Sequence, residues 1–332
     1  MSVILITGIN GFIGSNLAKR LIADGHKVRG LARKTSDLSF IDGCDIELFY
    51  GDITAPDTLP DTVKGVDIVV NVAGFASDWG SYEKFYKINV EGTQNIARAA
   101  CQGKVKRFVH ISTTAAYGFS GFRYKEESEP MADTIFAYCE TKKIAERWLF
   151  DLSEASEMEV VAIRPGNVFG TNDHTFIEKY ADALMAGKGG YIGGGRSWTA
   201  PAYVENLVEG IVLACFKKEA AGEAFFITDG LEIDWRTFTE KLCLELGIKP
   251  PRMSIPFWIG YTIAFLMEIT YKFFKTKKDP LLTRYRISNG GRDYHFSIKK
   301  AMDILGYRPK VTFDESIKAT AKWYKGSRVD KN

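Results

Sequence analysis

Apolar residues follow two alternating patterns along the first half of the chain. Short runs rich in valine and isoleucine, such as Val3–Thr7, are typical of parallel strands that are buried on both faces. Segments such as Phe12–Ala23 carry apolar residues at helical spacing and end near a glycine. The same patterns predict strands at Lys27–Ala32, Ile46–Tyr50, Val66–Val70, Arg107–Ser112 and Val160–Ile163, and helices at Tyr82–Cys101 and Phe136–Ala155. Strands that alternate with helices in this way predict an α/β fold with a doubly wound parallel sheet.

The alternation loosens beyond Gly170. A glycine-rich stretch at Gly187–Gly195 is followed by a predicted helix near Val204–Phe216. Helix-rich sequence interrupted by prolines then continues to the end of the chain. We therefore expect the doubly wound sheet over residues 1–168 and a second, smaller and mostly helical lobe over residues 169–332.

The composition excludes several classes of protein. The 332 residues are 45% hydrophobic and 26% charged, and 44 basic against 41 acidic residues give a net charge of +3, which argues against a dedicated nucleic-acid binder. The five cysteines have no CxxC spacing, so neither a disulfide framework nor a metal site is expected, and a reducing cytoplasmic compartment fits best. The first apolar run is too short for a signal peptide.

A glycine cluster separates the first predicted strand from the first predicted helix. From Thr7 to Gly14 it reads Thr-Gly-Ile-Asn-Gly-Phe-Ile-Gly. Glycine permits a tight turn and a close approach of a pyrophosphate, while the start of the helix supplies free N–H groups and a positive dipole end. In this position the motif predicts a dinucleotide site.

The end of the second strand distinguishes the two nicotinamide cofactors. An acidic residue there normally holds the ribose 2′-hydroxyl, whereas a basic residue accommodates a 2′-phosphate. Arg33 and Lys34 occupy this position, and no acid appears before Asp37. We therefore expect NADP(H) in preference to NAD(H), with a solvated basic turn as the alternative interpretation.

Three further side chains indicate acid–base chemistry. Tyr138 and Lys142 lie one helical turn apart on the same face of the helix predicted at Phe136–Ala155. A phenol, with a pKa of roughly 10, works as an acid or base near neutral pH only if its anion is stabilised, and a nearby ammonium does this. Thr113 follows the fifth strand, at the edge where ligands bind in open α/β sheets, so the three side chains should converge beside a cleft. His110, inside that strand, is expected to be a core histidine.

These motifs together resemble the extended short-chain dehydrogenase/reductase family, also described as the NAD-dependent epimerase/dehydratase family. The matches are the glycine cluster, Gly51-Asp52, Asn89–Thr93, Ser112-Thr113 with Tyr117-Gly118, Tyr138–Lys142 and Arg164–Gly170, in that family's order. The resemblance implies that residues 1–168, with a later return near 200–228, form a Rossmann-type cofactor domain and that 169–332 mainly bind substrate. It also implies that Tyr138 transfers a proton, that Thr113 is the catalytic hydroxyl residue, and that Lys142 binds the nicotinamide ribose while lowering the pKa of Tyr138.

The expected cofactor contacts come from the strand ends and the turns that follow them. They are Gly8, Asn10, Gly11, Phe12, Ile13, Gly14, Arg33, Lys34, Asp52, Ile53, Val72, Ala73, Gly74, Ser112, Tyr138, Lys142, Pro165, Gly166, Asn167 and Val168.

Departures from the family pattern narrow the activity. Dehydratases of this family carry Asp-Glu after the catalytic threonine, but Thr114 and Ala115 stand here. Sugar-nucleotide epimerases usually carry an arginine for the diphosphate in the segment that corresponds to 198–206, which lacks one, although Arg196 lies nearby. The carboxyl-terminal part looks more like the 3β-hydroxysteroid dehydrogenase branch. The resemblance thus implies hydride transfer between nicotinamide and a secondary alcohol or ketone on a hydrophobic, steroid-like or long-chain molecule; a sugar-nucleotide epimerase or reductase and a non-catalytic NADP-binding sensor or scaffold are the alternatives.

Two surfaces suggest larger partners. The stretch Pro256–Phe274 is apolar nearly all round for three turns and is followed by lysines, so residues 256–278 are a candidate for peripheral membrane contact and for one wall of the substrate pocket. Only about a dozen apolar residues precede Glu268, short of the roughly 20 that a membrane span needs. The helix at Tyr82–Cys101 and the helix with Tyr138 resemble the family's dimer-forming pair, so a homodimer is expected; their alternative role is only to cover the sheet.

Overall fold

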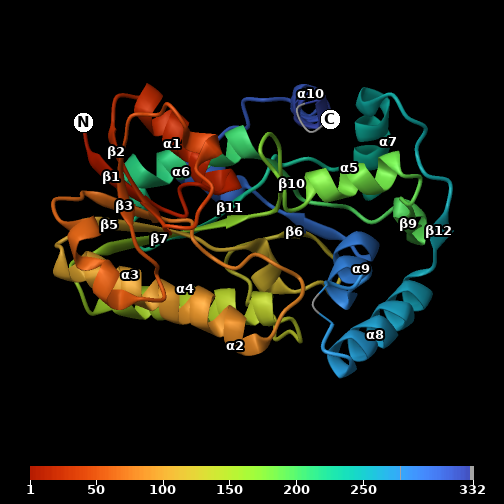
Figure 1. The fold of residues 1–332 in the computed structure, drawn as a ribbon, viewed down its shortest axis with the longest axis horizontal. Coiled ribbons are helices and arrows are strands. Elements are labelled where there is room, and N and C mark those ends of the chain that lie inside the picture. Colours follow the sequence, from red (N-terminus) through yellow and green to blue (C-terminus); the bar gives the residue numbers. More distant parts are fainter. Residues whose placement is uncertain (277, 330–332) are drawn as a thin grey trace.

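The computed structural model describes residues 1–276 and 278–329, and its centre is a seven-stranded parallel sheet (Figure 1). The strands are β1 (Val3–Thr7), β2 (Lys27–Ala32), β3 (Ile46–Tyr50), β4 (Ile68–Asn71), β5 (Arg107–Ile111), β7 (Glu159–Pro165) and β11 (Ala224–Ile227). Their order is β11-β7-β5-β4-β1-β2-β3, and every neighbouring pair is parallel. The chain therefore leaves β1 toward β2 on one side and later returns to β4 on the other, which creates a topological switch point between β1 and β4.

Helices cover both faces of the sheet, which confirms the predicted doubly wound fold. α1 (Phe12–Ala23) and α6 (Val204–Phe216) pack on one face, and α3 (Gly92–Gln102) and α4 (Ala137–Glu154) lie on the other (Figure 1). A separate apolar cluster lies on each face, so the central strands are buried on both sides. This burial explains their continuous valine and isoleucine runs.

The helix predicted at Tyr82–Cys101 is not one regular α-helix. It consists of α2 (Tyr82–Phe85), a π-helical turn at Tyr86–Glu91 and α3. The π-helical turn contains the buried Asn89, whose side chain accepts from the Phe75 N–H (2.7 Å) and donates to the hydroxyl of Thr141 (3.2 Å). These tertiary hydrogen bonds depend on residues far away in the sequence, which explains why periodicity alone predicts an unbroken helix.

The rest of the chain adds five helices and three short strand pairs. The helices are α5 (Ile177–Met185), α7 (Trp235–Leu246), α8 (Phe257–Phe273), α9 (Arg284–Gly291) and α10 (Phe313–Val329). The pairs are β8 (Asn167–Phe169) with β10 (Pro201–Tyr203), β9 (Tyr191–Ile192) with β12 (Ser254–Ile255), and β6 (Phe122–Lys125) with β13 (Tyr294–Phe296). None of the helices in the described part of the chain combines the length and apolarity needed to cross a bilayer.

The sheet domain and the C-terminal region share an apolar core near the carboxyl ends of the central strands. β6 comes early in the chain and pairs with β13 near its end. Buried aromatic residues from both regions pack there, including Tyr117, Phe226, Tyr294 and Phe296. The strand ends are thereby held in a fixed position relative to the C-terminal helices.

Candidate active site

The glycine cluster forms a tight turn between β1 and α1. Gly8 has a φ of +64°, which disfavours a residue with a side chain. A Cβ atom on Gly14 would lie 2.3 Å from the Gly8 carbonyl oxygen, so the turn closes only because residue 14 is glycine. The Gly11 N–H donates to the Gly8 carbonyl (3.0 Å), which completes the turn.

This turn fits the pyrophosphate of a nicotinamide dinucleotide. α1 begins at Phe12, and no side chain caps its N-terminus. The first N–H groups of the helix, at Phe12, Ile13 and Gly14, are thus available to an anion at the positive end of the helix dipole. Ser112, at the end of β5, adds a buried hydroxyl that has no hydrogen-bond partner among the described residues.

The predicted basic turn lies beside the glycine cluster. Arg33 and Lys34 are exposed at the end of β2, and neither pairs with a carboxylate of the described chain. The side chain of Asn10 donates to the carbonyl of Asp37 (3.1 Å), which connects the two turns. Two free cations next to the glycine turn offer positive charge to an additional phosphate.

The other expected cofactor residues lie at neighbouring strand ends, but several are engaged within the protein. The carboxylate of Asp52 accepts from the N–H and hydroxyl of Thr54, both at 2.8 Å, so it stabilises its own turn. Ala73, between Val72 and Gly74 after β4, donates its N–H to the Thr7 hydroxyl (3.0 Å). Ile53 is buried and packs against Gly92.

The segment from Pro165 to Val168 links β7 to β8. Asn167 forms reciprocal side-chain hydrogen bonds with Asn289 of α9, at 3.0 and 3.3 Å. A Cβ atom on Gly166 would lie 2.2 Å from the Ala200 carbonyl oxygen, so this position also requires glycine. The strand end where the nicotinamide is expected is therefore tied directly to the C-terminal lobe.

Thr113 and Tyr138 meet at the carboxyl end of β5. Thr113 is buried and precedes a short helical turn, while Tyr138 is half-buried near the start of α4. The Thr113 side chain acts on the Tyr138 hydroxyl and lowers its pKa, so the two residues come together as predicted. Burial raises the pKa of Tyr138 to about 12, and the effect of Thr113 opposes the shift. The phenol therefore retains its proton at neutral pH.

The amine of Lys142 is held by polar groups of strand β5. Its ammonium donates to the Ile111 carbonyl (2.5 Å) and lies 3.1 Å from Nε2 of His110. Burial lowers the pKa of Lys142 to about 8. Burial is the largest cause of the raised pKa of Tyr138, and the lowering of that pKa by Lys142 stays a prediction.

The imidazole of His110 links Lys142 to Asn71, a connection that the sequence does not predict. The residue is completely buried, and its Nδ1 lies 3.2 Å from the side-chain nitrogen of Asn71. Burial and then the charge of Lys142 hold the pKa of His110 well below its ordinary value, so the imidazole is neutral. A core histidine was expected, but its contact with Lys142 depends on how α4 packs on β5.

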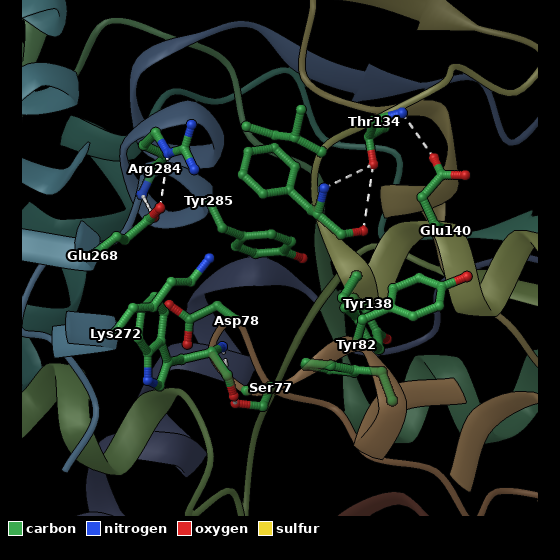
Figure 2. A pocket seen from close by; sticks show the side chains of 16 residues that line it. Ser77, Asp78, Tyr82, Thr134, Tyr138, Glu140, Glu268, Lys272, Arg284 and Tyr285 are labelled. Atoms are coloured by element: carbon green, nitrogen blue, oxygen red, sulfur yellow. Dashed lines mark hydrogen bonds and ion pairs between the residues drawn. The ribbon is translucent and has the colours of Figure 1, made fainter. Parts of the chain in front are cut away.

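A pocket of about 810 Å³, measured with the open solvent at its mouth, lies beside Tyr138 (Figure 2). Its aromatic lining consists of Trp79, Tyr82, Phe85, Phe136, Tyr138 and Tyr285. Glu268 and Lys272 of α8 lie on the opposite side from Tyr138, which confirms that this helix borders the pocket that contains Tyr138.

Charged residues of the pocket are paired, with one exception in the part of the chain that the structure describes. Glu268 pairs with Arg284 (2.8 Å), and Asp78 pairs with Arg286 (2.8 Å). Lys272 has no carboxylate partner there and lies near the Trp79 ring, 5.6 Å from its centre. Sequence motifs gave no signal for Asp78, Arg284 or Tyr285, since these residues come together only through tertiary packing.

Comparison with known proteins places the chain in a family. Residues 4–227 match the NAD-dependent epimerase/dehydratase family. The chain belongs to this family. It is an extended short-chain dehydrogenase/reductase of the 3β-hydroxysteroid dehydrogenase-like branch and an oxidoreductase, as the motifs predict.

Individual members of the family match over nearly the whole chain. A sterol-4-alpha-carboxylate 3-dehydrogenase (decarboxylating) from Mus musculus is 28% identical over 337 residues, covering 98% of this chain and 92% of the mouse protein. A 3β-hydroxysteroid dehydrogenase/Δ5→4-isomerase from Mycobacterium tuberculosis is 30% identical over 339 residues, covering 97% and 90%. The crystal structure of UDP-glucose 4-epimerase from Thermotoga maritima superimposes with a TM-score of 0.81 at 20% identity over 98% of this chain and 99% of the epimerase, a likeness of fold.

Proposed function

We propose that this oxidoreductase uses NADP(H) to interconvert a ketone and a secondary alcohol on a hydrophobic, steroid-like or long-chain molecule. The observation that carries the proposal is the pocket, where Tyr138 lies with five other aromatic residues and where α8 contributes Glu268 and Lys272. Because Asp78 and Glu268 are neutralised by arginines, the acids of this pocket do not oppose an apolar ligand. The mouse and mycobacterial relatives are named for sterol and steroid substrates, which supports the same class here.

The residues of this chain supply the proton in ketone reduction. A nicotinamide cofactor held by the glycine turn and the end of β7 would supply the hydride, with its electron pair, that the carbonyl carbon accepts. Tyr138, whose pKa of about 12 keeps the phenol protonated, gives its proton to the carbonyl oxygen, so the ketone becomes an alcohol. Thr113, which acts on the Tyr138 hydroxyl, orients the same oxygen. Oxidation of the alcohol is the reverse sequence.

Lys142 supports the site from below. Its donation to the Ile111 carbonyl fixes the amine next to the end of β5, within the reach of a nicotinamide ribose at Thr113. A cation there would stabilise the phenolate that remains on Tyr138 after proton transfer, which is the role predicted for Lys142. His110 holds this amine from the other side.

The free cations at the end of β2 support the choice of NADP(H). Arg33 and Lys34 are exposed beside the glycine turn, and neither pairs with a carboxylate of the described residues. We assign cofactor binding mainly to residues 1–168 with the return near 200–228, and substrate binding mainly to 169–332.

Assembly and location complete the proposal. α3 and α4 lie side by side on one outer face, where a partner's equivalent pair would form a homodimer. We further propose that the protein acts in the cytoplasm and that residues 256–278 contact a membrane surface.

A sugar-nucleotide epimerase is the second candidate. Arg196, the nearest arginine to the segment that should bind the diphosphate, has a side chain that is 73% exposed and pairs with Asp234, away from the pocket lining. This arrangement disfavours a nucleotide sugar in the pocket. A non-catalytic sensor or scaffold is disfavoured because Thr113 and Tyr138 come together beside the pocket.

A panel assay tests the proposal. Cofactor oxidation is measured with NADPH and NADH over steroid ketones, long-chain 3-oxo compounds and sugar nucleotides, and binding of the sugar nucleotides is followed by thermal shift. We expect saturable NADPH oxidation with apolar ketones. Saturation by a UDP-sugar alone would establish the epimerase alternative, and no turnover with any carbonyl would favour the sensor.

A further inference from the structure

Helix α8 lies at the edge of the molecule (Figure 1). It exposes many large apolar side chains. We call the surface that they form the α8 apolar face; it consists of Trp258, Ile263, Phe265, Leu266, Ile269, Phe273 and Phe274. Trp258 is 69% exposed, Phe273 is 79% exposed and Phe274 is 70% exposed. Several large apolar side chains so close together on a free surface mark a site of contact with another apolar body.

Only a narrow stripe of α8 packs on the protein. Gly260, Ala264 and Glu268 are its buried residues, spaced four apart along one side. A Cβ atom on Gly260 would come within 3.2 Å of Ile287 in α9, so small residues let the two helices approach closely. Glu268 pairs with Arg284 of α9. The packing on α9 therefore uses one side of α8 and leaves the α8 apolar face uncovered.

Positive charge borders this face at its carboxyl-terminal end. Lys272, Lys275 and Lys278 are exposed, and none of them pairs with a carboxylate of the described residues. The single acid in α8, Glu268, is buried and neutralised, so the nearest exposed carboxylate in sequence is Asp279. Lys277, which also belongs to the expected membrane segment, lies outside the described residues, as do positions 330–332.

We propose that the α8 apolar face docks on an anionic phospholipid bilayer, with α8 lying in the plane of the interface. Aromatic side chains favour the boundary between headgroups and acyl chains, and lysines beside them favour anionic headgroups. A second copy of this chain is the less suitable occupant, because a symmetric contact would bring two sets of unpaired lysines onto one interface. Charge complementarity therefore selects the lipid surface.

The docking surface adjoins the substrate pocket. Glu268 and Lys272 of α8 also line the pocket that contains Tyr138 (Figure 2). Docking would bring the mouth of this pocket close to the headgroups, so that an apolar ketone enters directly from the bilayer. The docking deepens the membrane contact proposed above for residues 256–278, and its consequence for substrate delivery rests in addition on the proposed ketone reduction.

Co-sedimentation with vesicles tests the docking without an activity readout. The full-length protein is mixed with vesicles of phosphatidylcholine alone or with one quarter phosphatidylglycerol, at low salt. We expect at least tenfold stronger partitioning to the anionic vesicles, and an at least tenfold loss for the double variant Phe273→Ser/Phe274→Ser. Lys275→Gln/Lys278→Gln should lose roughly 25-fold, since about 1 kcal/mol per lysine corresponds to about fivefold each.

Leu244→Ser is the matched control, because Leu244 is 73% exposed on α7 and lies outside the α8 apolar face. It should bind vesicles like the wild type, and all variants should keep the wild-type circular dichroism spectrum. Absence of vesicle binding, or equal binding by the Phe273/Phe274 variant, would overturn the proposal. Light scattering identifies the other occupant: a variant that turns a dimer into a monomer, without any vesicle binding by the wild type, would show that the face joins two copies. Ketone turnover measured without vesicles tests the proposed function separately.

Discussion

The phenol of Tyr138 is protonated at neutral pH and can donate its proton, because burial raises its pKa to about 12. Replacement of Tyr138 by phenylalanine removes the transferable proton while leaving the aromatic ring in the pocket lining. We expect turnover of the ketone to fall by at least about 10²-fold, the lower end of general acid–base contributions. Steady-state kinetics with saturating cofactor measure the loss. Near-normal turnover in this variant would exclude Tyr138 as the acid.

His110 makes the stability of the protein dependent on pH. Because the pKa of the folded-state imidazole lies well below its unfolded value of roughly 6.5, the unfolded chain binds more protons below that pH. Stability is therefore expected to fall as the pH drops from about 6.5 toward the folded pKa, by up to about 1.4 kcal/mol per pH unit.

Urea unfolding of the wild type and of His110→Gln between pH 5 and 8 measures this effect. The glutamine does not titrate, so its pH dependence should be the shallower of the two. His295, whose pKa is also lowered by burial, contributes equally to both proteins and cancels in the comparison. Parallel pH profiles would mean that His110 is protonated in the folded protein.

Replacement of Arg33 tests whether the protein prefers NADPH to NADH. If this arginine binds a 2′-phosphate, Arg33→Ala should weaken NADPH binding by roughly 1.5–3 kcal/mol, the contribution of a hydrogen bond to a charged group, with little change for NADH. Lys27→Ala is the matched control, because Lys27 is exposed at the opposite end of the same strand. Titration calorimetry gives both affinities. An equal loss for the two cofactors would reduce Arg33 to a solvated basic residue.

At the scale of elements, the turn between β1 and α1 depends on a single missing methyl group. A Cβ atom on Gly14 would lie 2.3 Å from backbone oxygen, so Gly14→Ala must move the turn or the helix. We expect at least a tenfold loss of cofactor affinity together with a lower thermal midpoint.

The control for this prediction is Gly326→Ala in α10. No atom lies within 4 Å of the position that the new Cβ would take, so the change should leave cofactor binding unaltered. It should stabilise the protein by about 0.5–1 kcal/mol, because alanine favours the helix. Wild-type cofactor affinity in Gly14→Ala would show that the turn tolerates displacement.

The sequence predicts well those elements whose buried residues form a regular apolar pattern. α1 occupies Phe12–Ala23, and β1, β2 and β3 occupy the predicted ranges. The interior strand β1 is marked by a continuous apolar run because it is buried on both faces, whereas the edge strand β3 is only partly buried. The two- and three-residue strands β8, β9, β10, β12 and β13 escaped prediction, since they are too short to carry a period. The sequence did not predict the π-helical turn, because the buried side chain of Asn89 is held there by hydrogen bonds to Phe75 and Thr141.

At the scale of the whole molecule, the pocket is built from parts that only the fold brings together. Asp78 accepts from Thr283 (2.6 Å) and pairs with Arg286, across more than two hundred residues of sequence. The sequence predicts three residues of the site. Tyr138 and Lys142 belong to a family motif, and Thr113 follows a strand at the sheet edge where ligands bind. Trp79, Tyr285 and the neutralised carboxylates are not predicted, since no local pattern records their neighbours.

Hydride transfer to an apolar ketone is the central claim, and isotope transfer measures it most directly. The protein is incubated with NADPH that carries deuterium on the transferable position of C4 and with a steroid or long-chain 3-oxo ketone, and the alcohol is analysed by mass spectrometry. The account predicts one deuterium on the new carbinol carbon for wild type, and at least a hundredfold less labelled product for Tyr138→Phe over the same time. Unlabelled or absent alcohol with apolar ketones, alongside conversion of a sugar nucleotide, would contradict it.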